Sequence, residues 1–586
     1  MRSSYRCIQL PLLKFVGFLT MVVGSIQCTN PPSLPSGDPD NGGLLVPENF
    51  EVLLVAKSIG RARHLAVNDN GDIYVKLRFA DEGKGGNLAL RDTTGDGKAD
   101  IIENFGDYQD EGGLANGMTI HNGYLYFSSA RNVYRNKLTP GKLIPDSEME
   151  LILTDDHEHG VLHWHITKPM AFDNQGYMYV PFGSPSDACQ DYSLGPIGIP
   201  GGKGLDPCPE LEKHGGVWRF DANKTGQTQE DGYRFASGLR SIVGMRWNEE
   251  DQSLYAVVHG IDNFHYIFPE LFTAWQGAVL PAEELVKIEE GANFGWPYCY
   301  YDQMLNKRML QPGYGGDGKV VGRCADYNLP LMGFPGHWGP NDLLFYRGDQ
   351  FPERYKQGAF IAFHGSTDRA PYPHAGYFVC FVPFENGIPT GQWEVFADGF
   401  AVVDTIVNTS DAHHRPMGLA EGPEGSLYIS DSREGKIWRV MFKGNKGNFG
   451  KGQLALIEER KLLPHLRTPD EILDNLEEDN LVGGKVYNRY CATCHQRNGK
   501  GDENRFPPLV GSDWVGGDKG RLIDVVLNGL QGKIEVSGIA YNNLMPAFQY
   551  LDDKQVAVIL TYIRQNFGNE VDEVSEAEVR VRRQLP

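Results

Sequence analysis

Between residues 45 and 440 the chain repeats one pattern of hydrophobic and polar positions. A small or apolar pair leads into a turn rich in Asp, Asn and Gly, and an apolar, aromatic strand follows. Turns such as Asp-Asn-Gly and Pro-Glu-Gly are typical of tight connections between antiparallel strands. The pattern therefore predicts repeated β-sheet units. Its copies are at residues 65–75, 122–126, 170–179, 245–255, 344–361 and 419–428.

One aromatic residue marks the strand in each copy, and successive markers are 52, 53, 76, 105 and 68 residues apart. This spacing fits one four-stranded unit per copy, with insertions in the later copies. We predict an all-β, six-bladed propeller over residues 45–440. A two-sheet sandwich would not explain repetition over this length. The markers are Tyr74, Tyr126, Tyr179, Tyr255, Phe360 and Tyr428.

The pattern changes after residue 440. Residues 441–478 begin with a Gly-, Lys- and Asn-rich stretch and predict a linker followed by a helical connector. Helix-type periodicity then predicts a small all-α domain over residues 479–570, with a first helix at 483–490. Asp552 and Asp553 are expected to cap its closing helix, and residues 571–586 are expected to be a charged tail. The apolar face of the closing helix would consist of Val556, Ile559, Leu560, Ile563 and Phe567.

The N-terminus has the pattern of a secretion signal. Arg2 and Arg6 precede an apolar run at residues 15–23, which is too short to span a bilayer comfortably. We expect residues 1–28 to be a signal peptide and residues 29–44 a flexible tether. Cys28 is a candidate lipoprotein cysteine, and ordinary signal cleavage nearby is the alternative. The sequence thus predicts a periplasmic protein, either free or anchored by a lipid to the inner or outer membrane.

Length and charge narrow the classes of function. A chain of 586 residues is too long for one core. Its net charge of −21 disfavours binding to nucleic acid. Export permits disulfides, and the short spacings favour Cys189–Cys208 and Cys299–Cys324, which leaves Cys380 free.

Residues 490–495 read Tyr-Cys-Ala-Thr-Cys-His. Two thiols three positions apart, followed directly by an imidazole, are the attachment pattern of a c-type haem. Cys491 and Cys494 would bond the haem covalently, and His495 would ligate its iron. A zinc site needs two more ligands, and residues 496–586 contain no Cys or His. Met545 is the single downstream methionine and therefore the candidate sixth ligand, and His/Met ligation predicts electron transfer.

Residues 92–103 have the spacing of a calcium loop, with oxygen donors at positions 1, 3, 5, 9 and 12 and Gly at position 6. Thr94 at position 3 and the lack of predicted flanking helices fit a polar hairpin equally well. Both interpretations therefore stay open. The candidate ligands are Asp92, Thr94, Asp96, Asp100 and Glu103.

Basic residues and imidazoles stand beside the predicted blade strands, where they would converge on a central channel. They lie at residues 63–64, 163–168, 239–241, 364–369 and 413–416. At these residues the chain resembles the soluble PQQ-dependent sugar dehydrogenases, the glucose/sorbosone and fungal pyranose dehydrogenase group. The similarity includes residues 238–240, 291–299, 351–355 and 364–366, and residues 479–570 resemble a class I cytochrome c.

The resemblance implies a mechanism. His165 would take a proton from a sugar hydroxyl while a hydride passes to PQQ, and Arg240 would stabilise the negative charge that develops. Ca²⁺ at PQQ would be held by backbone carbonyls at Gly260 and Ile261. Ser241, Lys168 and Ile261 depart from the usual Asn, Arg and Pro. The residues implied to bind the PQQ carboxylates are Arg63, Lys168, Arg240, His364, Arg369 and Arg415.

Together these features predict a quinohaemoprotein dehydrogenase that oxidises a sugar or related aldehyde or polyol. Electrons would pass through the fused haem c to a periplasmic acceptor. The alternative is a non-catalytic propeller that binds carbohydrate or protein and carries an electron-transfer haem domain. A hydrolase of the lactonase type would need carboxylates in the channel, whereas the candidates are mostly His and Arg.

Overall fold

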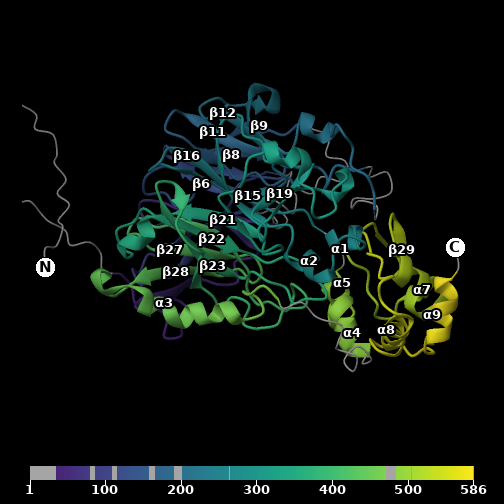
Figure 1. Ribbon diagram of the computed structural model, residues 1–586. Coiled ribbons are helices and arrows are strands. Elements are labelled where there is room, and N and C mark those ends of the chain that lie inside the picture. Colours follow the sequence, from purple (N-terminus) through teal and green to yellow (C-terminus); the bar gives the residue numbers. More distant parts are fainter. Residues whose placement is uncertain are drawn as a thin grey trace, which may run out of the picture.

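The computed structural model describes residues 34–78, 86–108, 115–156, 165–190, 201–262, 264–367, 369–469, 483–502 and 505–584. In these residues, six sheets of four or five strands form the blades of a propeller, and a smaller helical body lies at one side of it (Figure 1). The predicted fold class is therefore confirmed. The predicted signal peptide, with Cys28, falls outside the described residues.

The first three blades follow one another along the chain, and each runs from an inner strand outwards. Blade one contains β2 (Ala62–Val67), β3 (Ile73–Leu77), β4 (Asn87–Arg91) and β5 (Ile101–Phe105). Blade two contains β6 (Met118–His121), β7 (Tyr124–Ser128), β8 (Asn132–Lys137) and β9 (Met149–Thr154), with β13 (Gln227–Thr228) added in parallel. Blade three contains β10 (Ala171–Phe172), β11 (Tyr177–Phe182), β12 (Gly216–Asp221) and β14 (Tyr233–Ser237).

The last three blades carry the longer insertions. Blade four contains β15 (Ile242–Asn248), β16 (Ser253–Val258), β17 (Glu283–Ile288) and β20 (Met332–Phe334). Its insertions hold α1 (Phe264–Ile267), α2 (Ala274–Val279) and the hairpin β18 (Cys299–Asp302) and β19 (Lys307–Leu310). Blade five contains β21 (Pro340–Phe345), β22 (Gly358–Phe363), β23 (Phe378–Glu385), the short β24 (Ile388–Pro389) and β25 (Glu394–Ala397). Blade six contains β26 (Pro416–Glu421), β27 (Leu427–Asp431), β28 (Ile437–Phe442) and β1 (Phe50–Ala56).

The aromatic markers each lie on the second strand of a different blade, and all six side chains are buried. Aromatic rings also fill the space between neighbouring blades. The ring of Phe50 in blade six, for example, lies 4.9 Å from that of Phe351 and 5.2 Å from that of Phe396, both in blade five, centroid to centroid. The repeat in the sequence therefore corresponds to the repeat of the blades, as predicted.

Blade six closes the ring, because its outer strand comes from the start of the propeller sequence. Strand β1 pairs antiparallel with β28, with Phe50 opposite Phe442. The chain before β1 is also held in place: Trp438 Nε1 donates to the carbonyl oxygen of Gly42 at 3.0 Å, and Leu44 is buried. The prediction of a flexible tether over residues 29–44 is therefore wrong for residues 34–44.

The connector begins with α3 (Lys451–Glu458), which packs against blade five. The haem domain then contains α4 (Gly483–Tyr490), α5 (Ala492–His495), α6 (Asp513–Gly516), α7 (Lys519–Asn528), α8 (Asp553–Gln565) and α9 (Glu576–Arg583), with the hairpin β29 (Ile534–Val536) and β30 (Ile539–Tyr541). Asp552 caps α8, as predicted. Residues 576–583 are not a tail, because α9 buries Val579 in the core of the haem domain.

Both predicted disulfides, Cys189–Cys208 and Cys299–Cys324, are present, and Cys380 is free and buried. Within the part of the chain that the structure describes, no helix has the length and apolar character needed to cross a membrane.

Candidate functional site

The topology brings the predicted channel residues to one end of the ring. Arg63 lies at the start of the inner strand β2. Arg415 stands directly before the inner strand β26, and Arg240 stands two residues before the inner strand β15. His364 directly follows β22, the second strand of its blade. Because inner and second strands are antiparallel, the start of one and the end of the other meet at the same end of the propeller.

Arg240 is buried between two carboxylates. Its Nη2 donates to Asp262 Oδ2 at 2.8 Å and also contacts Asp187 Oδ1, and its Nη1 donates to the carbonyl oxygen of Gly260 at 2.5 Å. We call Arg240, Asp187, Asp262 and His165 the paired side of the site, because the buried cation there is matched by carboxylates.

Sharing one guanidinium between the buried carboxylate of Asp187 and the partly exposed carboxylate of Asp262 shifts their pKa values apart. Burial raises the pKa of Asp187 to about 7 against the attraction of Arg240. For Asp262, burial is outweighed by Arg240 and His337, and its pKa is lowered. Burial alone would lower the pKa of Arg240, but the two carboxylates raise it, so this guanidinium stays charged.

His165 is held as a neutral imidazole. Its Nδ1 lies 2.7 Å from the carbonyl oxygen of Ser184, so Nδ1 carries the proton and donates it there. Burial, and then the positive charge of Arg240, lower the pKa of His165 well below its usual value. The unprotonated Nε2 is therefore able to accept a proton.

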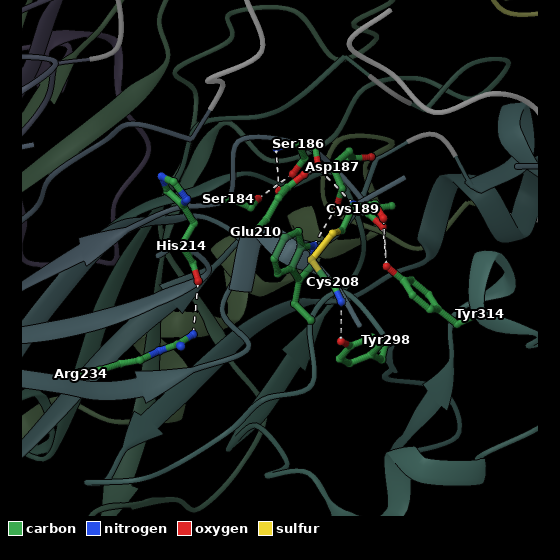
Figure 2. The surroundings of a disulfide bond; sticks show 12 residues. Ser184, Ser186, Asp187, Cys189, Cys208, Glu210, His214, Arg234, Tyr298 and Tyr314 are labelled. Carbon is green, nitrogen blue, oxygen red and sulfur yellow. Dashed lines mark hydrogen bonds between the residues drawn. A yellow bond between two sulfur atoms is a disulfide. The ribbon is translucent and has the colours of Figure 1, made fainter. Parts of the chain in front are cut away.

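The segment at residues 184–189, which ends at a disulfide-bonded cysteine, carries Ser184 and Asp187 (Figure 2). Cys189 is linked to Cys208, and the carbonyl of Asp187 accepts a hydrogen bond from Trp296 Nε1 at 2.8 Å. Ser184, which orients His165, donates from its hydroxyl to the Ser186 carbonyl at 2.6 Å. The segment at residues 184–189 thus orients the imidazole of His165 through Ser184 and the guanidinium of Arg240 through Asp187.

Arg63, Arg369 and Arg415 form what we call the open side. Within the described residues, none of the three has a carboxylate at ion-pair distance. Arg369 is fully buried, and neither of its terminal nitrogens has a hydrogen-bond partner. Arg63 Nε is likewise unpartnered, whereas Arg415 donates to the carbonyls of His364 and Gly365 at 3.0 and 2.7 Å.

The arginines of the open side carry positive charges that no carboxylate of the described chain compensates. Burial, and then the charges of Arg78 and Arg415, lower the pKa of Arg63 to about 9. Burial also lowers the pKa values of Arg369 and Arg415 to about 10. An uncompensated buried charge costs several kcal/mol, roughly, so such a cluster favours a ligand with several negative charges.

Two histidines lie beside these cations. Burial, followed by Arg415 and Arg63, lowers the pKa of His364 well below its usual value, and its Nε2 lies 2.5 Å from Ser432 Oγ. His374 is fully buried without a hydrogen-bond partner for either ring nitrogen. Burial, then Arg415 and Arg369, lower its pKa to about 3. Both rings are therefore neutral and leave the positive charge to the arginines.

Lys168 differs from the predicted anion-binding cations. Its Nζ lies 2.7 Å from Asp155 Oδ2, and both side chains are buried. The carboxylate compensates the charge of this ammonium, so Lys168, unlike the arginines of the open side, has an ion pair within the protein.

The predicted calcium sites have different surroundings. Gly260 and Ile261 line a cavity of about 30 Å³ together with Arg240, room for about one water. The loop at 92–103 joins β4 to β5 as a hairpin, in which Asp92 accepts the backbone N–H groups of Gly95 and Gly97. Thr93 donates to Asp100 at 2.6 Å, and Glu103 is exposed on β5. Among the described residues, no three His, Cys, Asp or Glu side chains are grouped to hold a metal ion. The calcium ligands Asp92, Thr94, Asp96, Asp100 and Glu103 therefore stay a prediction.

The haem motif lies on α5 and its N-cap. His495 is buried, and its Nδ1 donates to the carbonyl of Pro507 at 2.9 Å, which leaves Nε2 free for a metal. Burial lowers the pKa of His495, so the imidazole is neutral, as ligation requires. Cys491 and Cys494 are not disulfide-bonded, and Cys491 and Met545 both pack against the core of the haem domain.

Sequence reasoning missed Ser184, Asp187, Asp262 and His374. Asp262 directly follows Gly260 and Ile261, so its position was a signal that could have been used. The other three carry no local signal, because long-range pairing alone brings them to the site.

Comparisons with known proteins agree with this division of the chain. A family model described as TrAA12-like matches residues 44–443, and one described as cytochrome c oxidase, cbb3-type, subunit III matches residues 478–563. Cytochrome c-552 of Thermus thermophilus is 44% identical over 91 residues, which are 15% of this chain and 69% of that protein.

Solved structures share the propeller fold. The calcium structure of a Trichoderma reesei protein of Carbohydrate-Active Enzymes family AA12 has a TM-score of 0.51 at 18% identity, over 71% of this chain and 100% of that one. The holo form of the pyranose dehydrogenase PQQ domain of Coprinopsis cinerea has a TM-score of 0.51 at 16% identity, over 68% of this chain and 97% of that one.

Proposed function

The chain belongs to the TrAA12-like family and carries a C-terminal cytochrome c domain, and from this premise we propose that it is a quinohaemoprotein dehydrogenase. It would oxidise a sugar, or a related aldehyde or polyol, by hydride transfer to PQQ. Electrons would then pass to the haem c of the same chain. Aldose and sorbosone sugars are the first substrates to test.

The observation that carries this proposal is the contrast between the two sides of the site. The open side offers guanidinium N–H groups without protein partners, from Arg63 and Arg369, in a buried place. A planar ligand with several carboxylates, such as PQQ, would satisfy them with charge-assisted hydrogen bonds. Arg415 and His364 border the same place, and Lys168 would act only through its pair with Asp155.

His165 is the proposed general base. The Nδ1–H bond to Ser184 fixes the tautomer, and Nε2 would remove the proton of the substrate hydroxyl. A neutral imidazole of lowered pKa is unprotonated throughout the neutral range. Arg240, held by Asp187 and Asp262, would present a fixed positive charge to oxygen atoms that become negative.

When bound, PQQ supplies a carbonyl carbon that accepts the hydride. Backbone carbonyls at Gly260 and Ile261 are the proposed Ca²⁺ ligands of this site, and Ca²⁺ would polarise that carbonyl. Cys491 and Cys494 would bind the haem, and His495 and Met545 would ligate its iron. Each oxidised substrate releases two electrons, so a one-electron acceptor must reoxidise the iron twice per turnover.

Export is part of the proposal. The N-terminal pattern and the two disulfides support a periplasmic protein, since disulfides persist in oxidising compartments. Lipid attachment at Cys28 would add a membrane anchor, and the electron acceptor would be a periplasmic one.

The decisive experiment is reconstitution of the haem-loaded protein with PQQ and Ca²⁺, followed by a panel of aldoses and 2-keto-aldoses. We expect the haem absorption to shift to that of the reduced form, only when PQQ is present. Failure of PQQ to bind would favour the non-catalytic binding propeller instead.

A further inference from the structure

The haem-attachment segment lies directly on the propeller. In Figure 1, α5 lies beside the propeller near α2 and α1. Asn408 Nδ2 donates to the backbone carbonyls of Ala492 and Thr493, at 3.2 and 2.5 Å. In return, the Thr493 hydroxyl donates to the carbonyl of Val407 at 3.1 Å. Asn408 and Thr493 are both buried, so these bonds are shielded from water.

The propeller loop at residues 407–411, which we call the docking loop, is held by its own hydrogen bonds. Asp411 Oδ2 accepts the backbone N–H groups of Val407 and Asn408, at 2.9 and 3.2 Å. Asn408 Oδ1 accepts the N–H of Ser410 at 2.8 Å. The amide oxygen of Asn408 is thus used within the loop, and its NH₂ group is fixed toward the haem segment.

An aromatic contact lies beside these polar bonds. On the propeller, His265 and Tyr266 belong to α1, and their rings lie 4.9 Å from Tyr550 and 6.2 Å from Phe548 of the haem domain. Tyr490, which directly precedes Cys491, contacts the same two rings. The interface therefore combines directional hydrogen bonds with apolar packing, as specific interfaces do.

The docking loop also borders the open side. The backbone N–H of His374 donates to the carbonyl of Ile406 at 2.6 Å, and Arg415 follows Asp411 by four residues. From the haem domain, the positive charge of Arg505 contributes to the lowered pKa of Arg415. The docking loop therefore links two parts of the molecule. The chain beside it reaches the proposed cofactor site, and Asn408 contacts the haem segment.

We propose that the docking loop fixes the thioether edge of the haem against the propeller, and that Asn408 positions the haem to receive electrons. A haem bonded to Cys491 and Cys494 must have its vinyl edge beside the residues between them, and those residues contact the docking loop. The inference rests on the proposed function. Oxidation of one sugar releases two electrons and two protons. The haem iron would receive the two electrons one at a time and pass each to an external one-electron acceptor, and the two protons would pass to solvent.

The test uses the full haem-loaded chain reconstituted with PQQ and Ca²⁺. Asn408→Asp keeps the size of the side chain but turns a donor into a carboxylate that faces two carbonyl oxygens. We expect haem reduction by sugar, followed by stopped flow, to slow about tenfold or more, which matches the loss of one or two hydrogen bonds. Reduction of an added phenazine dye by the propeller should stay unchanged. Asn174→Asp, at an exposed turn of blade three, is the matched control and should change neither rate.

A second measurement keeps the docking idea separate from the proposed function. In the haem-loaded protein without PQQ, amide hydrogen exchange of residues 405–411 and 491–494 should be faster in Asn408→Asp by about tenfold. Unchanged exchange together with unchanged haem reduction would overturn the inference. If the unaltered protein shows no sugar-dependent dye reduction, the proposed function fails, and the exchange data alone decide whether Asn408 docks the haem domain. Asn408→Ala, which lacks the added charge, should show the same changes at smaller size.

Discussion

The two sides of the channel site hold their buried arginines in opposite ways. On the paired side, Arg240 lies between Asp187 and Asp262, and its charge is more than balanced. On the open side, Arg63, Arg369 and Arg415 have no carboxylate at ion-pair distance within the described chain. The protein thus compensates the cation on the side of the proposed base, whereas on the other side the proposed anionic ligand would have to do so.

The largest expected effect is on catalysis at the paired side. His165→Ala should lower sugar-dependent haem reduction by about 10²- to 10⁴-fold, the usual contribution of a general base. PQQ affinity should be unchanged, because the imidazole is not part of the open side. Rapid-mixing spectroscopy and PQQ titration measure the two quantities. His121→Ala, at a half-buried histidine stacked on Phe172 of blade three, is the control. If His165→Ala lowered haem reduction and PQQ affinity equally, the paired side and the open side would not have separate roles.

The next largest expected effect is on the free energy of unfolding, which should fall when the cation of the paired side is removed. Arg240→Leu leaves the buried carboxylate of Asp187, and the partly exposed one of Asp262, without their cation, so the free energy of unfolding of the apoprotein should fall by about 3–5 kcal/mol. Denaturant unfolding monitored by tryptophan fluorescence gives the value. A stability equal to that of the unaltered protein would mean that the two carboxylates do not need this guanidinium.

The open side should respond with the opposite sign. Arg369→Met removes a buried charge whose terminal nitrogens have no partner, so apoprotein stability should stay the same or rise by about 1–4 kcal/mol. PQQ affinity should fall by about tenfold or more, because a charge-assisted hydrogen bond is lost. Thermal unfolding with and without PQQ measures both. The control Arg131→Met, at an exposed arginine of blade two, should change neither apoprotein stability nor PQQ affinity. A strongly destabilised Arg369→Met apoprotein would show that a protein group already compensates this cation.

The smallest expected effect is a shift in pH dependence. Burial and Arg240 lower the pKa of His165, so the base becomes protonated, and activity is lost, only as the pH falls well below 6.5. The profile of kcat/KM against pH reports this group in the free enzyme. Arg240→Gln removes the nearby positive charge and should move the acid limb upward, whereas Arg369→Met should leave it in place. An acid limb centred at or above 6.5 in the unaltered protein would contradict the neutral-base interpretation.

The fold was readable from the sequence because its signals repeat locally. Tyr74 and its five counterparts mark one strand per blade, and the haem motif is contiguous. The helix α9 was missed, although Ser575 and Glu578 form a capping box directly before Val579. The many charged residues of α9 favoured a tail, and only one of its residues, Val579, is buried. The calcium-type spacing at 92–103 stays a prediction, and in the structure the carboxylate of Asp92 accepts backbone N–H groups of its own loop.

The site was only partly readable. The family resemblance pointed to His165 and Arg240, but nothing in the sequence links Arg240 to Asp187, 53 residues earlier. Likewise, no local pattern pairs Lys168 with Asp155 or leaves Arg369 unpaired. These differences depend on which groups the folded ring brings within a few ångströms. The sequence therefore identifies the candidate cations, whereas only the folded structure shows which carboxylate, if any, forms an ion pair with each.

The pairing of β1 with β28 ties the cofactor channel to a strand far from every site residue. Residues 50–56 are made before the other propeller strands and have no strand partner until residues 437–442 are complete, so the ring cannot close before almost all of its blades exist. Proteolytic removal of residues 34–56 would leave β28 as an exposed edge strand. Loss of this one strand should therefore open the ring and expose the molecule to aggregation, and under the proposed function it should also release PQQ, although no residue of the site or of the haem motif is removed.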